Sequence, residues 1–143
     1  MAITKAMRDR HTVRKYIDKP LPPDVVRQLE QRILRLNAEC GTSLKLMVED
    51  SSAFNFITRL VLAKGVRNYV ILAGFAEPGL AERLGWAGSD LVLFAQELGL
   101  NTWWATGTFN HLTTSRAVPG KRVLGVIALG YGATQGKIGR AHV

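Results

Sequence analysis

The sequence predicts an α+β fold, an α/β sandwich with helices packed on a small, mainly antiparallel or mixed sheet. Two long amphipathic helical patterns and several short strand patterns follow one another along 143 residues, enough chain for one domain with its own core. Hydrophobic residues make up 47% of the chain and charged residues 21%, as is typical of a globular protein.

The first half of the chain contains two predicted helices and two predicted strands after a short helical pattern at residues 3–7. Pro23 suits a first helical position, and Gly41 is placed to end the helix that follows. The core side of this helix is predicted by apolar residues at spacings of four, four and three: Val25, Leu29, Ile33 and Leu36. Alternation at residues 43–49 predicts a half-buried strand containing Leu44, Leu46 and Val48. A helix over 53–62 and a fully covered central strand over 68–74 are expected next.

The second half begins with the pattern expected to form the longest helix, which Gly99 ends. One face of this helix is predicted to contain Leu80, Leu84, Ala87, Leu91, Phe94, Ala95 and Leu98. Two further strands are expected at residues 101–107 and 121–132. His111 lies between these strands and is expected to be a surface residue at a helix start.

The formal net charge of +8 is compatible with nucleic acid or with a phosphorylated cofactor as the partner. Aromatic residues do not alternate with the basic ones as they would in a base-stacking surface, so nucleic acid is the less favoured partner. The first ten residues contain no apolar signal core and no apolar run is long enough to span a bilayer, so we expect a cytoplasmic protein that does not bind membranes. Cys40 is the only cysteine, which excludes an internal disulfide and a cysteine-based zinc cluster.

The stretch "RHTVR" at residues 10–14 is the first candidate site. In an extended conformation, Arg10, Thr12 and Arg14 point to one side and His11 to the other. Two guanidinium groups and a hydroxyl on one side suit a phosphate dianion, which arginine binds through bidentate, charge-assisted bonds. A solvated basic turn after a helix accounts for the same composition. The residues alone leave both interpretations open.

The stretch "TWWATG" at residues 102–107 is the second candidate. Gly107 follows a predicted strand and would let the backbone approach a planar ligand closely, beside the flat side chains of Trp103 and Trp104. Packing of at least one of these tryptophans in the core is the alternative. The later stretch "GYGATQGK" does not match a phosphate-binding loop, because five residues separate Gly130 from Gly136 where that loop has four.

Three stretches together resemble the nitroreductase superfamily, specifically its branch of small "putative nitroreductase" proteins. They are "AMRDRHTVRKYIDKPLPPDVV" at the start, "AGSDLVLFAQELGLNTWWATGTF" in the middle and "VLGVIALGYGATQGK" near the end. The first is the most specific, because it combines a helix, the Arg-His-Thr-x-Arg pattern and a proline-rich loop. The resemblance implies a nitroreductase-like fold and, usually, an intertwined homodimer.

The activity that the resemblance implies is that of an FMN-dependent NAD(P)H oxidoreductase. Such enzymes transfer a hydride through flavin N5 in two steps, from NADH or NADPH and then to a nitroaromatic, a quinone or a similar electron-poor small molecule. The residues that match the family's contacts to the FMN phosphate, ribityl chain and pyrimidine edge are Arg10, His11, Thr12 and Arg14. Those that would line the isoalloxazine ring are Trp104, Ala105, Thr106 and Gly107. No catalytic side chain and no metal are expected.

The last six residues, "IGRAHV", differ from the family pattern. They read as the translation of a common sequencing-library adapter, so residues 138–143 are expected to be a non-native tail, although a divergent natural tail is the alternative. The nitroreductase-like domain is then expected to span residues 1–137 and to be incomplete at its C-terminal end. Two other functions stay open: a flavin-binding module without turnover, and a basic nucleic-acid-binding protein.

Overall fold

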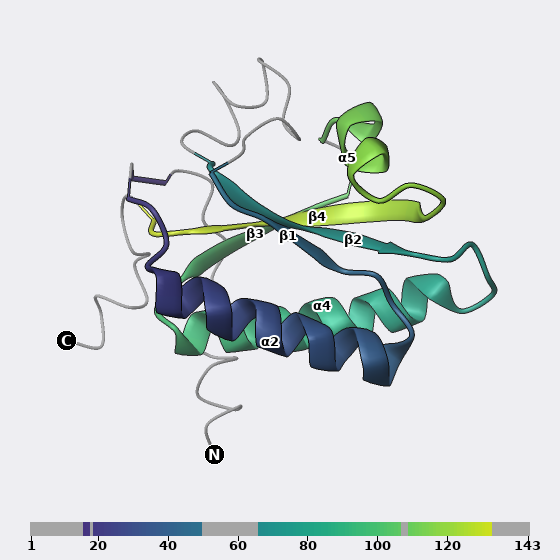
Figure 1. The fold of residues 1–143 in the computed structure, drawn as a ribbon, viewed down its shortest axis with the longest axis horizontal. Coiled ribbons are helices and arrows are strands. Elements are labelled where there is room, and N and C mark those ends of the chain that lie inside the picture. The colour runs from purple at the N-terminus through teal and green to yellow at the C-terminus, as the bar shows by residue number, and fades with distance from the viewer. Residues whose placement is uncertain (1–15, 18, 50–65, 107–108, 133–143) are drawn as a thin grey trace.

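The computed structural model describes residues 16–17, 19–49, 66–106 and 109–132. Two helices of 18 residues, α2 (Pro23–Cys40) and α4 (Leu80–Glu97), lie side by side on one face of a four-stranded sheet (Figure 1). A short helix, α5 (His111–Ala117), lies on the other side. The strands are β1 (Lys45–Met47), β2 (Asn68–Gly74), β3 (Asn101–Ala105) and β4 (Arg122–Gly130). The predicted α+β fold of helices on a small sheet is confirmed.

The sheet has the order β1-β2-β4-β3, and every neighbouring pair is antiparallel. The two central strands, β2 and β4, are rich in valine, isoleucine and leucine, which suit a pleated and covered surface. All seven residues of β2 are buried, as the sequence predicts for a central strand. The register shifts between Leu72 and Ala73, where Leu124 of β4 is the extra residue without a partner, as in a β-bulge.

Helix α2 begins and ends where its sequence predicts. Pro23 occupies the first turn, where its missing N–H costs no hydrogen bond. Gly41 adopts a left-handed conformation with φ of 66° and donates its N–H to the Asn37 carbonyl, which closes the helix. The Asn37 side chain then accepts a hydrogen bond from the Leu44 N–H at 2.8 Å and donates one to the Leu44 carbonyl, so α2 is tied directly to the start of β1.

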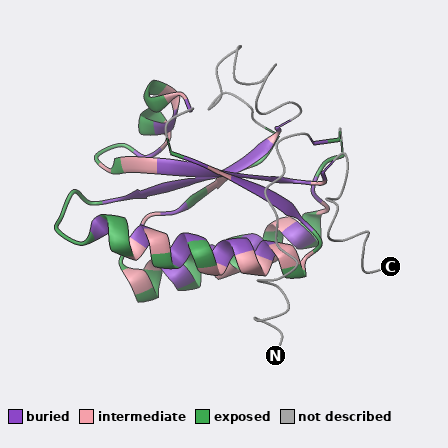
Figure 2. Cartoon of the chain, turned by 180° about the vertical axis from the view of Figure 1, so that it is seen from behind, coloured by how far each residue is buried: buried purple, intermediate pink, exposed green. Residues whose placement is uncertain are grey.

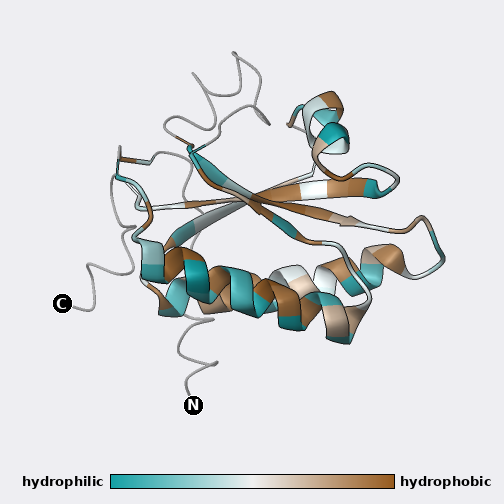
Figure 3. Cartoon of the chain, viewed as in Figure 1, coloured by the Kyte–Doolittle hydropathy of each residue, from teal (hydrophilic) through white to brown (hydrophobic). Residues whose placement is uncertain are grey.

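The two faces of the sheet have separate hydrophobic clusters, as Figure 2 shows by the buried residues along the strands. The cluster between the sheet and the two long helices includes Leu29, Leu36, Val70, Leu84, Leu91, Ile127 and Leu129. The cluster on the opposite face includes Tyr16, Tyr69, Ile71, Trp103, Phe109, Val118 and Val126. Figure 3 shows by hydropathy that the central strands β2 and β4 are mostly hydrophobic, whereas hydrophobic and hydrophilic residues alternate along α2.

Some predicted elements differ from the structure or fall outside the described residues. Helix α4 equals α2 in length, so the prediction that it is the longest helix is wrong for the described part of the chain. Strand β1 ends at Met47, so Val48 lies outside the strand in which it was expected and is exposed. The expected helices at 3–7 and 53–62 and the expected tail at 138–143 lie outside the described residues. Among the helices that the structure describes, none combines the length and apolar composition needed to cross a bilayer.

Candidate functional site

The second candidate stretch lies at the C-terminal end of β3, an edge strand of the sheet. Trp104 and Ala105 are the last residues of the strand, and Thr106 follows them as an exposed residue. Gly107, and with it Arg10, His11, Thr12 and Arg14 of the first candidate stretch, lie outside the described residues. The described part of the candidate site therefore consists of the end of β3 and the chain around Tyr16.

The two tryptophans of β3 point to opposite faces of the sheet. Trp103 is 6% exposed and belongs to the cluster on the α5 side. The half-buried Trp104 packs on the α4 side, where its ring lies over Gly88: a Cβ at Gly88 would lie 2.5 Å from the Trp104 Cη2 atom. The interpretation that at least one of these tryptophans packs in the core is confirmed by the burial of Trp103.

Gly125 of β4 lets the end of β3 approach its neighbour closely. A Cβ at Gly125 would lie 3.0 Å from the Ala105 carbonyl oxygen and 3.6 Å from the Thr106 methyl carbon. Ala105 is buried, so its backbone is held in place by packing on both sides. Among the described strands β3 pairs with β4 alone, so β3 is an edge strand of the described sheet.

Tyr16 marks the other end of the site, near the start of β3. It forms an isolated antiparallel bridge with Gly132, and the neighbouring Ile17 N–H donates to the Tyr131 carbonyl at 2.9 Å. Asn101, the first residue of β3, accepts a hydrogen bond from the Gly132 N–H at 2.8 Å. The tyrosine ring packs on Gly130, where a Cβ would lie 2.9 Å from it. Burial of this ring raises the pKa of the Tyr16 phenol far above its ordinary value of 10.0.

The two described parts of the site lie at opposite ends of the same strand. Asn101 and Ala105 are four positions apart along β3, which corresponds to about 14 Å at the usual rise of an antiparallel strand. Two residues of chain, at most about 7 Å, connect Tyr16 to Arg14. An elongated ligand that lies along the β3 edge could therefore have its anionic end near Tyr16 and its planar end near Thr106.

The remaining titratable candidates do not form a catalytic group with these residues. His111 is exposed at the start of α5, as predicted, and its ring lies 4.1 Å from the Phe109 ring. Cys40 ends α2 and is half-buried; burial, followed by the charges of Glu39 and Asp90, raises the pKa of its thiol and disfavours a reactive thiolate. No cluster of three metal-binding side chains occurs within residues 16–17, 19–49, 66–106 and 109–132.

Three residues that position the strand were missed from the sequence: Gly88, Asn101 and Gly125. Gly88 gives a detectable signal, because a glycine inside a long helix lowers the stability of the helix. Its presence there suggests that another group approaches the helix closely. Gly125 gives a similar signal inside a strand. Asn101 gives none, because its partner Gly132 is 31 residues away in the chain.

Comparisons with known proteins identify what this arrangement resembles. The model of the family described as "Putative TM nitroreductase" matches residues 2–142. Similar folds occur in an FMN-dependent nitroreductase from Clostridium difficile R20291 (TM-score 0.72, 15% identity, 90% of this chain and 86% of that one) and in a "putative nitroreductase" in complex with FMN from Desulfovibrio desulfuricans (0.73, 17%, 94% and 88%). A nitroreductase family protein from Clostridium novyi NT is also similar (0.70, 17%, 96% and 90%). No curated protein matches the sequence.

Proposed function

Since this chain belongs to the family described as "Putative TM nitroreductase", we propose that it is an FMN-dependent NAD(P)H oxidoreductase acting on nitroaromatics, quinones or similar electron-poor small molecules. The observation that carries the proposal is the family match over residues 2–142. The matched region includes the end of β3, where the candidate site lies. Two of the similar structures are described as FMN-dependent or in complex with FMN, which supports the choice of cofactor.

The β3 side of the site fits a flavin ring. A flavin needs backbone donors and acceptors along the edge of its planar ring, and β3 is an edge strand of the described sheet. The Trp104 ring on Gly88 and the close contact between Ala105 and Gly125 hold that strand end in one position. The residues proposed to line the ring are Trp104, Ala105, Thr106 and Gly107.

The phosphate end of FMN is assigned to the first candidate stretch. The residues proposed to bind the phosphate, ribityl chain and pyrimidine edge are Arg10, His11, Thr12 and Arg14. Arginine is suited to this role because its planar guanidinium group forms two parallel bonds to phosphate oxygens. The bridge between Tyr16 and Gly132 supports the assignment, because it ties the chain two residues after Arg14 to the start of β3.

The chemistry that bound FMN would supply is hydride transfer from NADH or NADPH to an electron-poor acceptor. The protein's own residues would bind and orient the flavin and exclude water from it. Ala105 and Gly125 keep bulky side chains away from the strand end, so the backbone itself can face the ring. The buried cluster behind Trp103 and Phe109 excludes water from the inner side of this strand.

A second copy of the chain is the proposed partner, in keeping with the family resemblance. Trp86 is 72% exposed on the outer face of α4, beside Leu93 and Phe94, and these residues line a groove of about 350 Å³. Exposed apolar surface of this kind is typical of an interface between proteins. Light scattering of the purified protein should give twice the mass of one chain, and Trp86→Ser should shift the mass toward one chain.

Turnover of the FMN-loaded protein tests the proposed activity. Oxidation of NADH and NADPH should be stimulated by 4-nitrobenzamide or by a benzoquinone, with more product formed than protein present. Protein that retains FMN but shows no stimulation with any of these acceptors would instead be a flavin-binding module without turnover. Colourless protein that retains DNA in a strongly salt-sensitive manner would support a nucleic-acid-binding role.

A further inference from the structure

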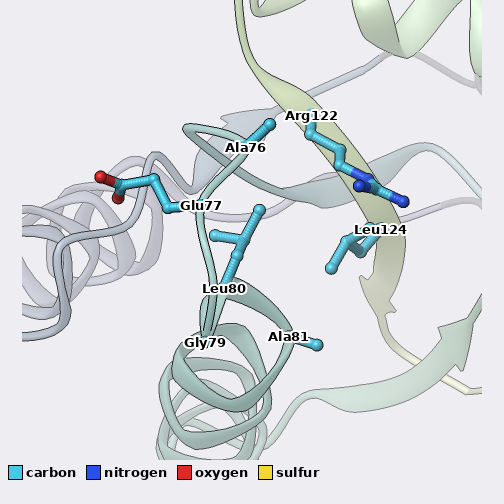
Figure 4. Close-up of a pocket in the computed structure, with 7 residues that line it drawn as sticks. All are labelled: Ala76, Glu77, Gly79, Leu80, Ala81, Arg122 and Leu124. Carbon is cyan, nitrogen blue, oxygen red and sulfur yellow. The ribbon is translucent and has the colours of Figure 1, made fainter.

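A small pocket lies where the first turn of α4 faces the start of β4, and the proposed function does not use it. It has a volume of about 280 Å³ and is lined by Ala76, Glu77, Gly79, Leu80, Ala81, Arg122 and Leu124. Figure 4 shows Leu80 and Ala81 from α4 opposite Arg122 and Leu124 from β4. Leu80 is buried because it packs against Gly74, where a Cβ would lie 2.5 Å from the leucine Cδ1 atom. The inner wall is therefore rigid and apolar.

The charges around the pocket single out Arg122. The Glu77 carboxylate is paired with Arg83 at 3.2 Å, and Figure 4 shows it turned away from Leu80 and Arg122. Lys121 donates to the Ser43 hydroxyl at 3.0 Å and lies over the Phe75 ring at 4.4 Å. Arg122 is exposed, and no described residue forms an ion pair or hydrogen bond with its guanidinium group. The pocket thus offers one uncompensated cation beside an apolar wall.

The size and position of the pocket limit what it can bind. About 280 Å³ is at the lower end of the range for small-molecule sites, which suits one aromatic ring and is too small for a dinucleotide. Leu124 is adjacent in the chain to Gly125, which in turn lies against Ala105 and Thr106 at the end of β3. The pocket is therefore one residue along β4 from the glycine that contacts the end of β3.

We propose that the Arg122 pocket binds a small aromatic carboxylate, with the ring against Leu80 and Leu124 and the carboxylate on the Arg122 guanidinium group. This inference rests on the proposed function in one respect: it makes aromatic acids, such as a nitrobenzoate, the preferred class of electron acceptor. A carboxylate forms a charge-assisted, bidentate bond with arginine, whereas an amide of the same shape does not. Arg122 is accordingly a specificity-determining residue.

Direct binding tests the pocket without any redox reaction. Benzoate, which cannot be reduced here, should bind the FMN-loaded protein at least tenfold more tightly than benzamide in a titration followed by saturation-transfer NMR. Arg122→Gln should abolish this preference. Arg116→Gln, which removes an exposed arginine from α5 outside the pocket, should retain it. Equal affinity of benzoate for the protein and for Arg122→Gln would overturn the proposal.

Turnover then tests the acceptor class. The Michaelis constant for 4-nitrobenzoate should be at least tenfold lower than that for 4-nitrobenzamide. Arg122→Gln should raise the Michaelis constant for 4-nitrobenzoate and leave that for 4-nitrobenzamide unchanged. An unchanged acid preference in Arg122→Gln would overturn the role of Arg122 in acceptor choice. Absence of turnover with every acceptor would count against the proposed function, and the benzoate titration would still decide the pocket.

Discussion

At the scale of single residues, Gly88 shows how one missing side chain positions the candidate site. It lies inside α4, where alanine would be the better helix former by about 0.5–1 kcal/mol. The Trp104 ring occupies the space that a Cβ would need. Glycine at this position therefore lowers the stability of the helix but allows close contact between α4 and the end of β3.

Gly88→Ala should lower the free energy of unfolding by about 1–3 kcal/mol, because the Trp104 ring must move out of a packed position. Gly85→Ala is the matched control: it lies in the same helix, and its Cβ would meet no atom within 4 Å. That variant should be more stable by about 0.5–1 kcal/mol. Urea unfolding of both variants provides the measurement. Equal effects of the two substitutions would show that Trp104 does not depend on Gly88.

Tyr16 links stability to pH. Burial raises the folded-state pKa of its phenol above the unfolded value near 10, so the folded protein keeps a proton that the unfolded chain releases above pH 10. The free energy of unfolding is unaffected by this group below pH 10 and decreases above it, by up to about 1.4 kcal/mol per pH unit.

Tyr16→Phe should make the decline of stability above pH 10 shallower, because the unfolded chain of the variant has no phenol at this position to release a proton. Urea unfolding at a series of pH values from about 9 to 11 measures the slope. Tyr131→Phe, at a partly exposed position next to the same bridge, should leave the slope as it is in the unmodified protein. A slope in Tyr16→Phe that equals that of Tyr131→Phe would contradict the assignment.

At the scale of elements, α5 is the shortest of the described helices and depends most on contacts outside its own backbone hydrogen bonds. It has seven residues, and a helix of that length is not stable alone in water. The Asn110 side chain accepts a hydrogen bond from the Thr113 N–H at 3.1 Å, and the buried Thr114 hydroxyl donates to carbonyls of the preceding turn. The helix is thus held by its N-terminal cap and by its contact with β4.

Asn110→Ala should lower the free energy of unfolding by about 1 kcal/mol, whereas Asn110→Asp should retain most of the stability because a carboxylate also caps a helix. Hydrogen exchange should speed up in the α5 amides of the alanine variant and remain slow in β2. If the alanine and aspartate variants exchange alike, the cap does not hold this helix.

The elements were predictable from sequence to different degrees, for physical reasons. Periodic apolar residues identified α2 and α4, and a short continuous apolar run identified β2, because burial on one face or on both faces dictates each pattern directly. The end of β1 was not predictable, because Val48 has strand propensity although the described pairing of β1 with β2 ends at Met47. The sheet order was not predictable either, since β4 inserts between β2 and β3 through contacts between residues far apart in the chain.

At the scale of the whole molecule, the fold brings together segments that the sequence separates widely. The Tyr16–Gly132 bridge and the Asn101–Gly132 hydrogen bond gather three distant parts of the chain at one end of β3. The motifs "RHTVR" and "TWWATG" could be identified from sequence because each carries its own chemistry. How the two motifs lie relative to each other could not be predicted from sequence, because it depends on β3 and on the Tyr16–Gly132 bridge that follows the first motif. The Arg122 pocket was not foreseen, because α4 and β4 form it jointly.

Fluorescence titration of FMN tests the central claim most directly, which is that Arg10 and Arg14 hold the phosphate of a bound flavin. Quenching of FMN fluorescence should saturate at one FMN per chain, and riboflavin, which lacks the phosphate, should bind far more weakly. The Arg10→Ala/Arg14→Ala variant should lose about 1.5–3 kcal/mol of FMN binding for each arginine, with riboflavin affinity almost unchanged. An FMN affinity in the double variant equal to that of the unmodified protein, or no quenching with either ligand, would contradict the account.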